Sequence, residues 1–287
     1  MSKAENKKTN KKTSESQFTI KLDNNKVLKT IVETLSKIFD EANFTVSPKE
    51  LTVKGMDPSK ICLIELHFKK GDFQEFQCDK ECKVGLNLDD FDKILKRASS
   101  DDALELSFKT EEQKLKIKMI RKESTKSRVF SLASLELDIE EPPLDNLKSI
   151  EYPAIWSIKT DFLVEALKDG EIYSEIFNIE AIEDKGLKFA SWGTIGEMEY
   201  QLDLDDLISS DLSDIQAGSF SITFLKSIMK LSDITEELEI SAKTDKPLKL
   251  FFRLLEGAEL EYYLAPRVEN EVSEDSGDSE ESEDDSD

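Results

Sequence analysis

Two halves of this 287-residue chain follow the same order of sequence patterns, and this internal repeat is the strongest constraint on its fold. An amphipathic segment begins at Val27–Ile31, and a similar one begins 136 residues later at Leu163–Leu167. A second amphipathic segment, 91–96, has its counterpart 134 residues further on, at 225–230. A period this long indicates a duplicated domain and not a solenoid of short repeats.

Alternation of apolar and polar residues predicts β-hairpins in both halves. In the first half, Phe44–Val46 and Leu51–Val53 flank a turn. In the second half, Ile179–Ile182 and Leu187–Phe189 flank the turn at 183–186. Turn residues between two alternating runs are typical of a hairpin. The sequence therefore predicts an α+β fold of two duplicated domains, each with two short helices packed on β-sheets.

Charge divides the chain into five segments. We predict a disordered basic tail at 1–16, domains at 17–134 and 149–268, a connector at 135–148, and a disordered acidic tail at 269–287. The basic tail has a net charge of +3, the acidic tail −11, and the body between them −15, within a total of −23. Both tails are too polar to compensate the entropy lost on ordering. The acidic body argues against nonspecific adhesion to nucleic acid over its whole surface.

The segment between the halves is predicted to be an extended connector. It contains Pro142 and Pro143 among several acidic residues, which disfavours both a helix and an interior strand. An ordinary linker would explain this composition equally well. The apolar residues Leu137, Ile139 and Leu144 are nevertheless more than a spacer requires.

The sequence contains no pattern that predicts catalysis, a cofactor or a metal site. Cys62, Cys78 and Cys82 are odd in number, which suits a reducing compartment, and no second cysteine pair accompanies Cys78 and Cys82. The only histidine, His67, lies in a strand-like alternating run. We find neither a nucleophile–base constellation nor a glycine-rich phosphate loop, and no apolar run predicts a membrane span or a signal segment. We expect a non-enzymatic protein that stays inside its cell.

Basic residues concentrate on the polar faces of the predicted helices. Around 26–39, 91–98 and 222–231, the apolar residues form one stripe and lysines occupy the opposite side. The helix at 161–169 departs from this pattern, because acidic residues surround its lysine. A solvated helix face is the alternative interpretation. Lysines on such faces suit sequence-independent contact with phosphates. The candidate DNA-facing residues are Lys26, Lys29, Lys37, Lys93, Lys96, Arg97, Lys168, Lys226 and Lys230.

Several motifs resemble the proliferating cell nuclear antigen (PCNA) type of DNA sliding clamp. Glu261–Val268, which reads Glu-Tyr-Tyr-Leu-Ala-Pro-Arg-Val ahead of an acidic tail, resembles the C-terminal signature of that family. Gly55–Leu63 resembles its Met-Asp-x-Ser-x-Val-x-Leu motif, and Gly85–Leu88 followed by Lys93–Lys96 resembles its Gly-Val-Asn-Leu stretch and Lys-Ile-Leu-Lys helix. With Ala166–Asp169, the C-terminal motif is more similar to archaeal than to animal or fungal members.

The resemblance implies a ring of three two-domain subunits whose helices line a central hole. Lysines on those helices would surround duplex DNA without reading its sequence, and the acidic outer surface would be repelled by it. Edge strands of neighbouring subunits would pair and so close the ring. The expected interface residues are Arg128, Val129, Phe130, Ser131 and Leu132 on one subunit and Met198, Glu199, Tyr200, Gln201 and Leu202 on the next.

The resemblance also implies a pocket for short peptides, roughly Gln-x-x-aliphatic-x-x-aromatic-aromatic, through which such clamps recruit enzymes. Implied partners are DNA polymerase, a clamp loader, flap endonuclease and DNA ligase. Mostly apolar lining suits aromatic and aliphatic anchors. Carried over position by position, the pocket comprises Met56, Lys60, Ile61, Leu63, Leu144, Pro247, Tyr263, Ala265, Pro266 and Val268.

The sequence thus predicts a sliding clamp that acts as a DNA polymerase processivity factor and recruits replication and repair enzymes. Two alternatives stay open: an acidic histone-chaperone-like scaffold, suggested by the tail and net charge, and a clamp relative specialised for damage signalling. A homotrimer and a heterotrimer are both compatible with the sequence. We expect a cytoplasmic, nucleoid-associated protein in an archaeal cell, or a nuclear one in a eukaryote.

Overall fold

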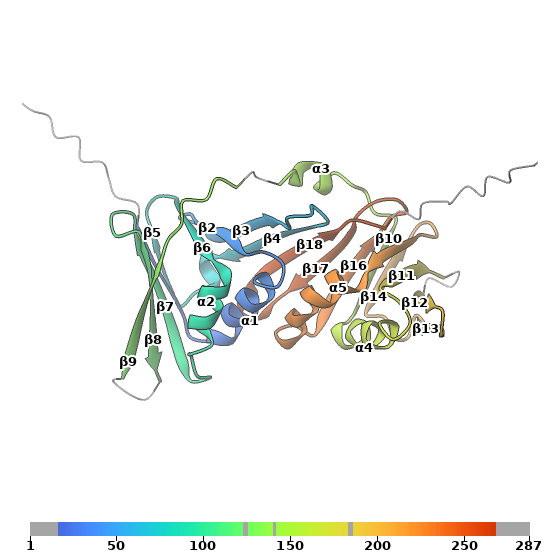
Figure 1. The fold of residues 1–287 in the computed structure, drawn as a ribbon. Coiled ribbons are helices and arrows are strands. Elements are labelled where there is room, and N and C mark those ends of the chain that lie inside the picture. Colours follow the sequence, from blue (N-terminus) through green and yellow to red (C-terminus); the bar gives the residue numbers. More distant parts are fainter. Residues whose placement is uncertain (1–16, 123–125, 140–141, 183–185, 268–287) are drawn as a thin grey trace, which may run out of the picture.

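The computed structural model describes residues 17–122, 126–139, 142–182 and 186–267. Both predicted tails, the turn at 183–185 and the candidate pocket residue Val268 lie outside the described residues. Figure 1 shows an elongated molecule with β-sheets along its length and a row of helices on one side.

The two halves repeat one order of elements, in which α-helices follow the first and the sixth strand. The first half consists of β1 (Gln17–Leu22), α1 (Asn25–Leu35), β2 (Glu41–Val46), β3 (Glu50–Met56), β4 (Cys62–Lys69), the 3₁₀ helix η1 (Lys70–Asp72), β5 (Glu75–Cys78), β6 (Cys82–Asn87), α2 (Leu88–Leu95), β7 (Asp102–Lys109), β8 (Lys114–Arg121) and β9 (Ser127–Ala133). A short helix, α3 (Leu144–Lys148), lies in the connector. The second half consists of β10 (Ala154–Lys159), α4 (Thr160–Gly170), β11 (Ile176–Ala181), β12 (Leu187–Gly193), β13 (Gly196–Leu202), β14 (Ser209–Leu212), β15 (Ala217–Ser221), α5 (Ile222–Ile228), η2 (Met229–Asp233), β16 (Glu237–Ala242), β17 (Leu248–Arg253), η3 (Leu255–Gly257) and β18 (Glu259–Leu264).

Strand pairing repeats as well. In the first half β1 pairs with β5 and β7, β2 with β3 and β6, β3 with β4, and β8 with β7 and β9; all these pairs are antiparallel. The equivalent strands of the second half pair in the same way. The predicted hairpins are confirmed, because Phe44 lies opposite Val53 and Ile179 opposite Phe189. Both halves therefore fold to the same topology, as the sequence repeat predicts.

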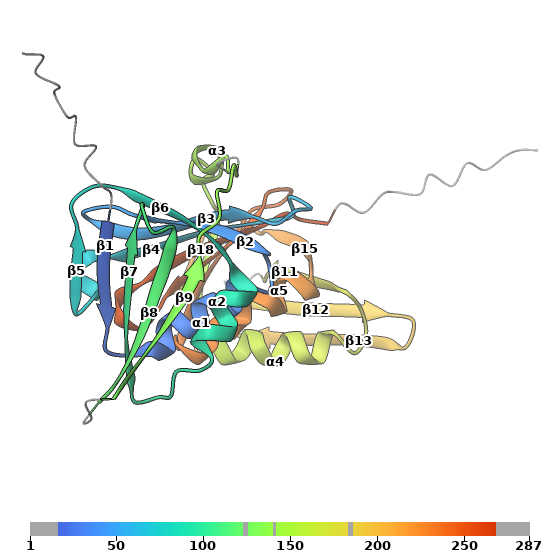
Figure 2. The same cartoon turned by 60° about the vertical axis from the view of Figure 1, so that its left-hand side comes forward.

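A single sheet joins the two halves. Its order is β14-β10-β16-β17-β18-β4-β3-β2-β6, and the join is the pair β18–β4, in which Tyr263 lies opposite Leu63. Two smaller sheets, β5-β1-β7-β8-β9 and β13-β12-β11-β15, lie at opposite ends of the molecule (Figures 1 and 2). The terminal strands of the first of these sheets are β5 and β9, and those of the second are β13 and β15.

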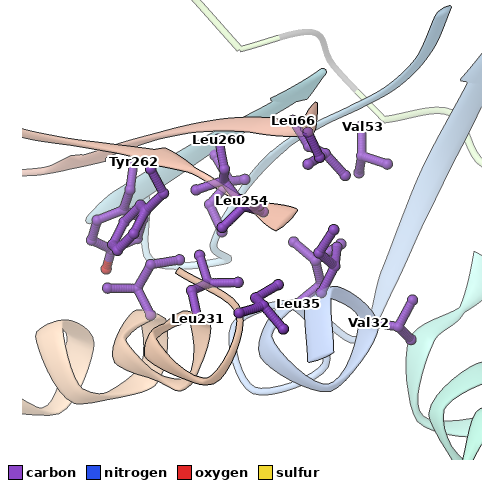
Figure 3. Packing of buried hydrophobic residues seen from close by; sticks show 14 of the residues in the cluster. Val32, Leu35, Val53, Leu66, Leu231, Leu254, Leu260 and Tyr262 are labelled. Atoms are coloured by element: carbon purple, nitrogen blue, oxygen red, sulfur yellow. The ribbon is translucent and has the colours of Figure 1, made fainter. Parts of the chain in front are cut away.

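The helices α1, α2, α4 and α5 cover the inner face of the sheets. Their apolar stripes form the core with the strands: Figure 3 shows Leu35 and Leu231 on the helix side of the core, facing Leu260 of β18. Asparagine side chains cap the first two helices, since Asn24 Oδ1 accepts from the Lys26 amide at 3.0 Å and Asn87 Oδ1 accepts from the Asp90 amide at 3.0 Å.

Two helical segments differ from the sequence prediction. Helix α2 begins at Leu88, three residues before the apolar stripe that predicted it, because Asn87 caps it there. The connector is not extended throughout. It contains α3, which lies on the outer face of the sheet, opposite the other helices (Figure 2).

Candidate nucleic-acid and partner interfaces

The nine candidate DNA-facing residues lie on the polar faces of α1, α2, α4 and α5 or in the segments that directly follow α1, α2 and α5. Seven of them are exposed, including the four residues Lys26, Lys37, Arg97 and Lys168. No carboxylate among the described residues lies within ion-pair distance of these four side chains. Their charges are therefore available to a polyanion.

The other five candidate residues already have partners within the chain. Lys93 pairs with Asp90 at 3.0 Å, Lys96 with Asp92 at 2.7 Å and Lys230 with Asp233 at 2.6 Å. Lys226 pairs with Glu171, and Lys29 Nζ donates to the Ala98 carbonyl at 3.3 Å. Sequence reasoning missed these carboxylates because it placed the start of α2 too late and considered each helix separately. The helix layer is thus less basic than the lysines alone suggest.

Two of the edge strands, β9 and β13, carry the ten candidate interface residues. Phe130 and Leu132 of β9 and Met198 and Tyr200 of β13 are partly buried against the core, whereas Val129 is 59% exposed. Both edges therefore present rows of half-buried apolar side chains next to unpaired backbone groups, an arrangement that favours pairing with another chain.

Charged groups flank both edges. Arg128 of β9 donates to the buried carboxylate of Asp102 at 2.6 Å and to the Arg97 carbonyl at 3.0 Å. Burial alone would raise the pKa of Asp102, but hydrogen bonds from Ser99 and from its arginine partners lower it to about 2. At the other edge, the Tyr200 hydroxyl donates to Glu165 of α4 at 3.0 Å. One edge is thus basic and the other acidic.

The candidate peptide pocket lies on the outer face, where β4 meets β18. Its central residues Leu63 and Tyr263 contact Leu144 and Leu147 of α3 in an apolar cluster that is separate from the main core. Around this cluster lie five partly buried candidate residues and one exposed one. The partly buried residues are Met56, Ile61, Pro247, Ala265 and Pro266, and the exposed residue is Lys60.

Hydrogen bonds donated by backbone amides fix the loop between β3 and β4 beside this cluster. Asp57 Oδ1 accepts from the amides of Ile61 and Cys62, both at 2.6 Å, and the Ala265 amide donates to the Ile61 carbonyl at 2.9 Å. Lys60 has a φ of +58°, the left-handed conformation that this tight loop requires. The structure thus brings the two predicted pocket segments, 56–63 and 263–266, side by side.

A buried carboxylate lies next to the pocket on β4. Glu65 is 1% exposed; its Oε1 is 3.0 Å from His67 Nε2 and 3.4 Å from Lys54 Nζ, and its Oε2 pairs with Lys148 of α3. Burial alone would raise the pKa of Glu65, but the hydrogen bonds from His67 and Lys148 lower it to about 2. The Glu65 bond also raises the pKa of His67, against the effect of burial, and Glu50 adds to this at 3.0 Å.

We predict that His67 stabilises the folded chain more at acid than at alkaline pH. Its folded pKa lies above the ordinary value of 6.5, so its contribution is complete below that pH and is lost as the pH rises through the folded pKa. The stability difference between the wild type and His67→Gln, measured by urea unfolding, should be larger at about pH 6 than at about pH 9. An equal difference at both pH values would contradict this assignment.

The described residues hold no group of three or more His, Cys, Asp or Glu side chains arranged to bind a metal ion. In the same part of the chain, no helix combines the length and the apolar character that crossing a membrane demands.

Comparison with known proteins gives consistent matches. The family model for the PCNA N-terminal domain matches residues 17–141. A DNA polymerase sliding clamp of Thermofilum pendens is 32% identical over 244 residues, covering 84% of this chain and 95% of that protein. One of Thermococcus fumicolans is 30% identical over 255 residues, covering 88% and 99%. The crystal structure of PCNA from Thermococcus kodakaraensis superposes with a TM-score of 0.79 at 25% identity, covering 87% of this chain and all of that one.

Proposed function

Because this chain belongs to the PCNA family of DNA sliding clamps, we propose that three copies close head to tail into a ring around duplex DNA. This chain is a DNA sliding clamp, and the sliding-clamp family is a family of non-catalytic processivity factors for DNA polymerase. The ring, its inner surface, the peptide pocket and the absence of any catalytic activity are the further parts of the proposal.

The observation that carries the ring is the repeat of strand pairing. The two halves are joined by the fourth strand of the first half and the ninth strand of the second, β4 and β18. The strands equivalent to these two in the opposite halves, β9 and β13, are terminal strands of the two smaller sheets, and they lie at opposite ends of the molecule (Figure 1). Pairing β9 of one subunit with β13 of the next would repeat the internal join. A repeated join of this kind is heterologous and closes into a ring when the rotation allows it.

The repeat also specifies a register for this junction. The strand pairings of the two halves make Arg128 equivalent to Leu260, and Tyr200 equivalent to Leu66. Leu260 lies opposite Leu66 within the chain. By equivalence, Arg128 of one subunit lies opposite Tyr200 of the next, and Phe130 two residues on lies opposite Met198. The four side chains then share the inner face of the junction.

Charge complementarity supports this junction. Arg97 and Arg128 lie beside β9, whereas the exposed face of α4 next to β13 carries Asp161, Glu165 and Asp169. The acidic character of α4 departs from the other helices, and a role against the basic edge of the next subunit accounts for it. Lys168 remains the candidate DNA-facing residue of this helix.

Duplex DNA is the ligand proposed for the helix-lined surface. Contacts of lysine with phosphate give sequence-independent attraction that weakens as salt rises. We expect the cations without acidic partners to contribute most, since Lys93 and Lys226 must first separate from carboxylates. In the proposed ring each subunit would present these residues to the same duplex.

We predict that Lys26→Ala with Lys37→Ala weakens the binding of closed rings to duplex DNA more than Lys93→Ala with Lys226→Ala. The slope of log affinity against log salt concentration is negative, and removing one lysine–phosphate interaction makes it less steep by about 0.9. A salt titration with nicked circular DNA measures both slopes. The second variant is the matched control, because it removes two paired lysines. Equal slopes for the two variants would contradict the assignment of the free cations.

The pocket between β4 and β18 is proposed to bind aromatic-anchored peptides of DNA polymerase, the clamp loader, flap endonuclease and DNA ligase. What supports it is the convergence of segments 56–63 and 263–266 on one apolar cluster under the connector. Similarity to archaeal clamps favours an archaeal, nucleoid-associated protein in the cytoplasm, and it favours the clamp over the chaperone-like and damage-signalling alternatives.

Two measurements test the proposal together. Light scattering after size exclusion should give the mass of three chains, and DNA synthesis on primed circular DNA should become more processive when a clamp loader adds the ring. A stable monomer that fails to stimulate synthesis would reject the proposal. A requirement for a second, related chain would indicate a heterotrimer.

A further inference from the structure

The helix α3 covers the two central residues of the candidate peptide pocket. Leu63 and Tyr263 are 4% and 2% exposed, and Leu144 and Leu147 of α3 pack against them. Leu144 is itself 6% exposed. The apolar surface that a partner peptide would need is therefore already occupied by two leucines of the same chain.

An ion pair holds α3 in this position. Lys148, the last residue of α3, pairs with Oε2 of Glu65, while His67 and Lys54 contact the other oxygen. Among the described side chains, Oε2 has no hydrogen-bond partner to replace Lys148. Leaving a buried carboxylate oxygen without a partner is unfavourable, so the pair favours the covered state.

Little else stabilises α3. It spans five residues, its N-terminus follows Pro142 and Pro143, and no side chain caps it. A helix this short is not stable alone in water, so its helicity depends on the contacts with the sheet. Beyond α3 the chain is fixed again at Tyr152, whose hydroxyl donates to the Pro247 carbonyl at 2.9 Å.

We propose that α3 is a lid whose Leu144 and Leu147 occupy, in the free clamp, the positions that the apolar anchors of a partner peptide take. The inference rests on the proposed function of the pocket. Binding then requires α3 to leave the sheet and the Lys148–Glu65 pair to break. The apparent dissociation constant equals the intrinsic one divided by the fraction of open molecules, so each interaction that closes the lid weakens binding.

Peptide affinity of lid variants tests this proposal. Leu147→Ala and Lys148→Ala each remove one closing interaction without touching Leu63 or Tyr263. We expect each to tighten the binding of a synthetic aromatic-anchored peptide about threefold to tenfold in calorimetry of the full-length ring. Lys70→Ala is the control, because Lys70 is an exposed lysine in η1 and should leave the affinity unchanged.

Hydrogen exchange gives a readout without peptide. The amides of Ser149 and Ile150 donate to the carbonyls of Asp145 and Leu147 at 3.1 and 3.2 Å, and they should exchange faster in Lys148→Ala than in the wild type. Amides of β4 and β18 should exchange at the same rate in Lys148→Ala and in the wild type.

The possible failures are distinguishable. If the wild type binds the peptide and both lid variants bind it with equal or weaker affinity, the lid alone is rejected. In that case α3 either contacts the bound peptide or has no part in binding. Absence of peptide binding by the wild type and by every variant rejects the pocket itself and the lid with it.

Discussion

Phe130→Asp is expected to leave the subunit folded and to convert the ring into single subunits that no longer support processive synthesis. Phe130 lies on the free edge strand β9 and is only partly buried within its own chain. In the proposed register it faces Met198 of the next subunit, so the substitution would bury an unpaired carboxylate in the junction. A buried charge without a partner typically costs about 3 kcal/mol or more, which is over a hundredfold in affinity at each junction.

The control for this variant is Leu212→Asp. Leu212 is also partly buried, and it lies on β14, an edge strand that the proposed ring leaves free. Light scattering should give one chain for Phe130→Asp and three for Leu212→Asp, with similar thermal unfolding of the two subunits. A trimer in both variants would show that β9 does not form the junction. Loss of the trimer in both would indicate a general effect on folding.

The repeat and the hairpins could be predicted from sequence because each depends on local patterns. Alternation at 44–53 and the matched amphipathic segments are set by which face of a strand or helix is buried. The join between the halves could not be derived in this way. Whether β4 pairs with β18 depends on residues about two hundred positions apart, and the family resemblance placed Leu63 and Tyr263 in one pocket without specifying this strand pair.

The candidate sites could be predicted as residue sets but not as contacts. The lysine faces of the helices are where amphipathic patterns place them. Their ion pairs depend on tertiary neighbours, as Lys226 with Glu171 of the segment after α4 shows. Likewise, the family resemblance implies Leu144 in the pocket, but the proline-rich connector gives no signal for α3. A helix of five residues is stabilised by the surface beneath it and leaves almost no periodicity in the sequence.

The second large effect is expected at the pocket, where Tyr263→Ala with Pro266→Ala should abolish binding of the aromatic-anchored peptide. Tyr263 packs against the leucines of α3. Pro266 directly follows Ala265, whose amide donates a hydrogen bond to the Ile61 carbonyl. Truncating two such side chains at an interface hot spot costs about 2 kcal/mol or more each, which is well over a hundredfold for the pair.

Truncation of a buried tyrosine also removes packing in the subunit, so affinity must be separated from stability. Calorimetry with the peptide gives the first, and thermal unfolding with light scattering gives the second. Phe251→Ala is the control: Phe251 lies on the same outer face, opposite Glu261 of β18, but it is not a candidate pocket residue. The double variant should remain a trimer and still encircle DNA, because the cations of α1 lie on the other side of the sheet. Wild-type affinity in the folded double variant would place the pocket elsewhere, whereas weakened affinity in Phe251→Ala as well would extend it across β17.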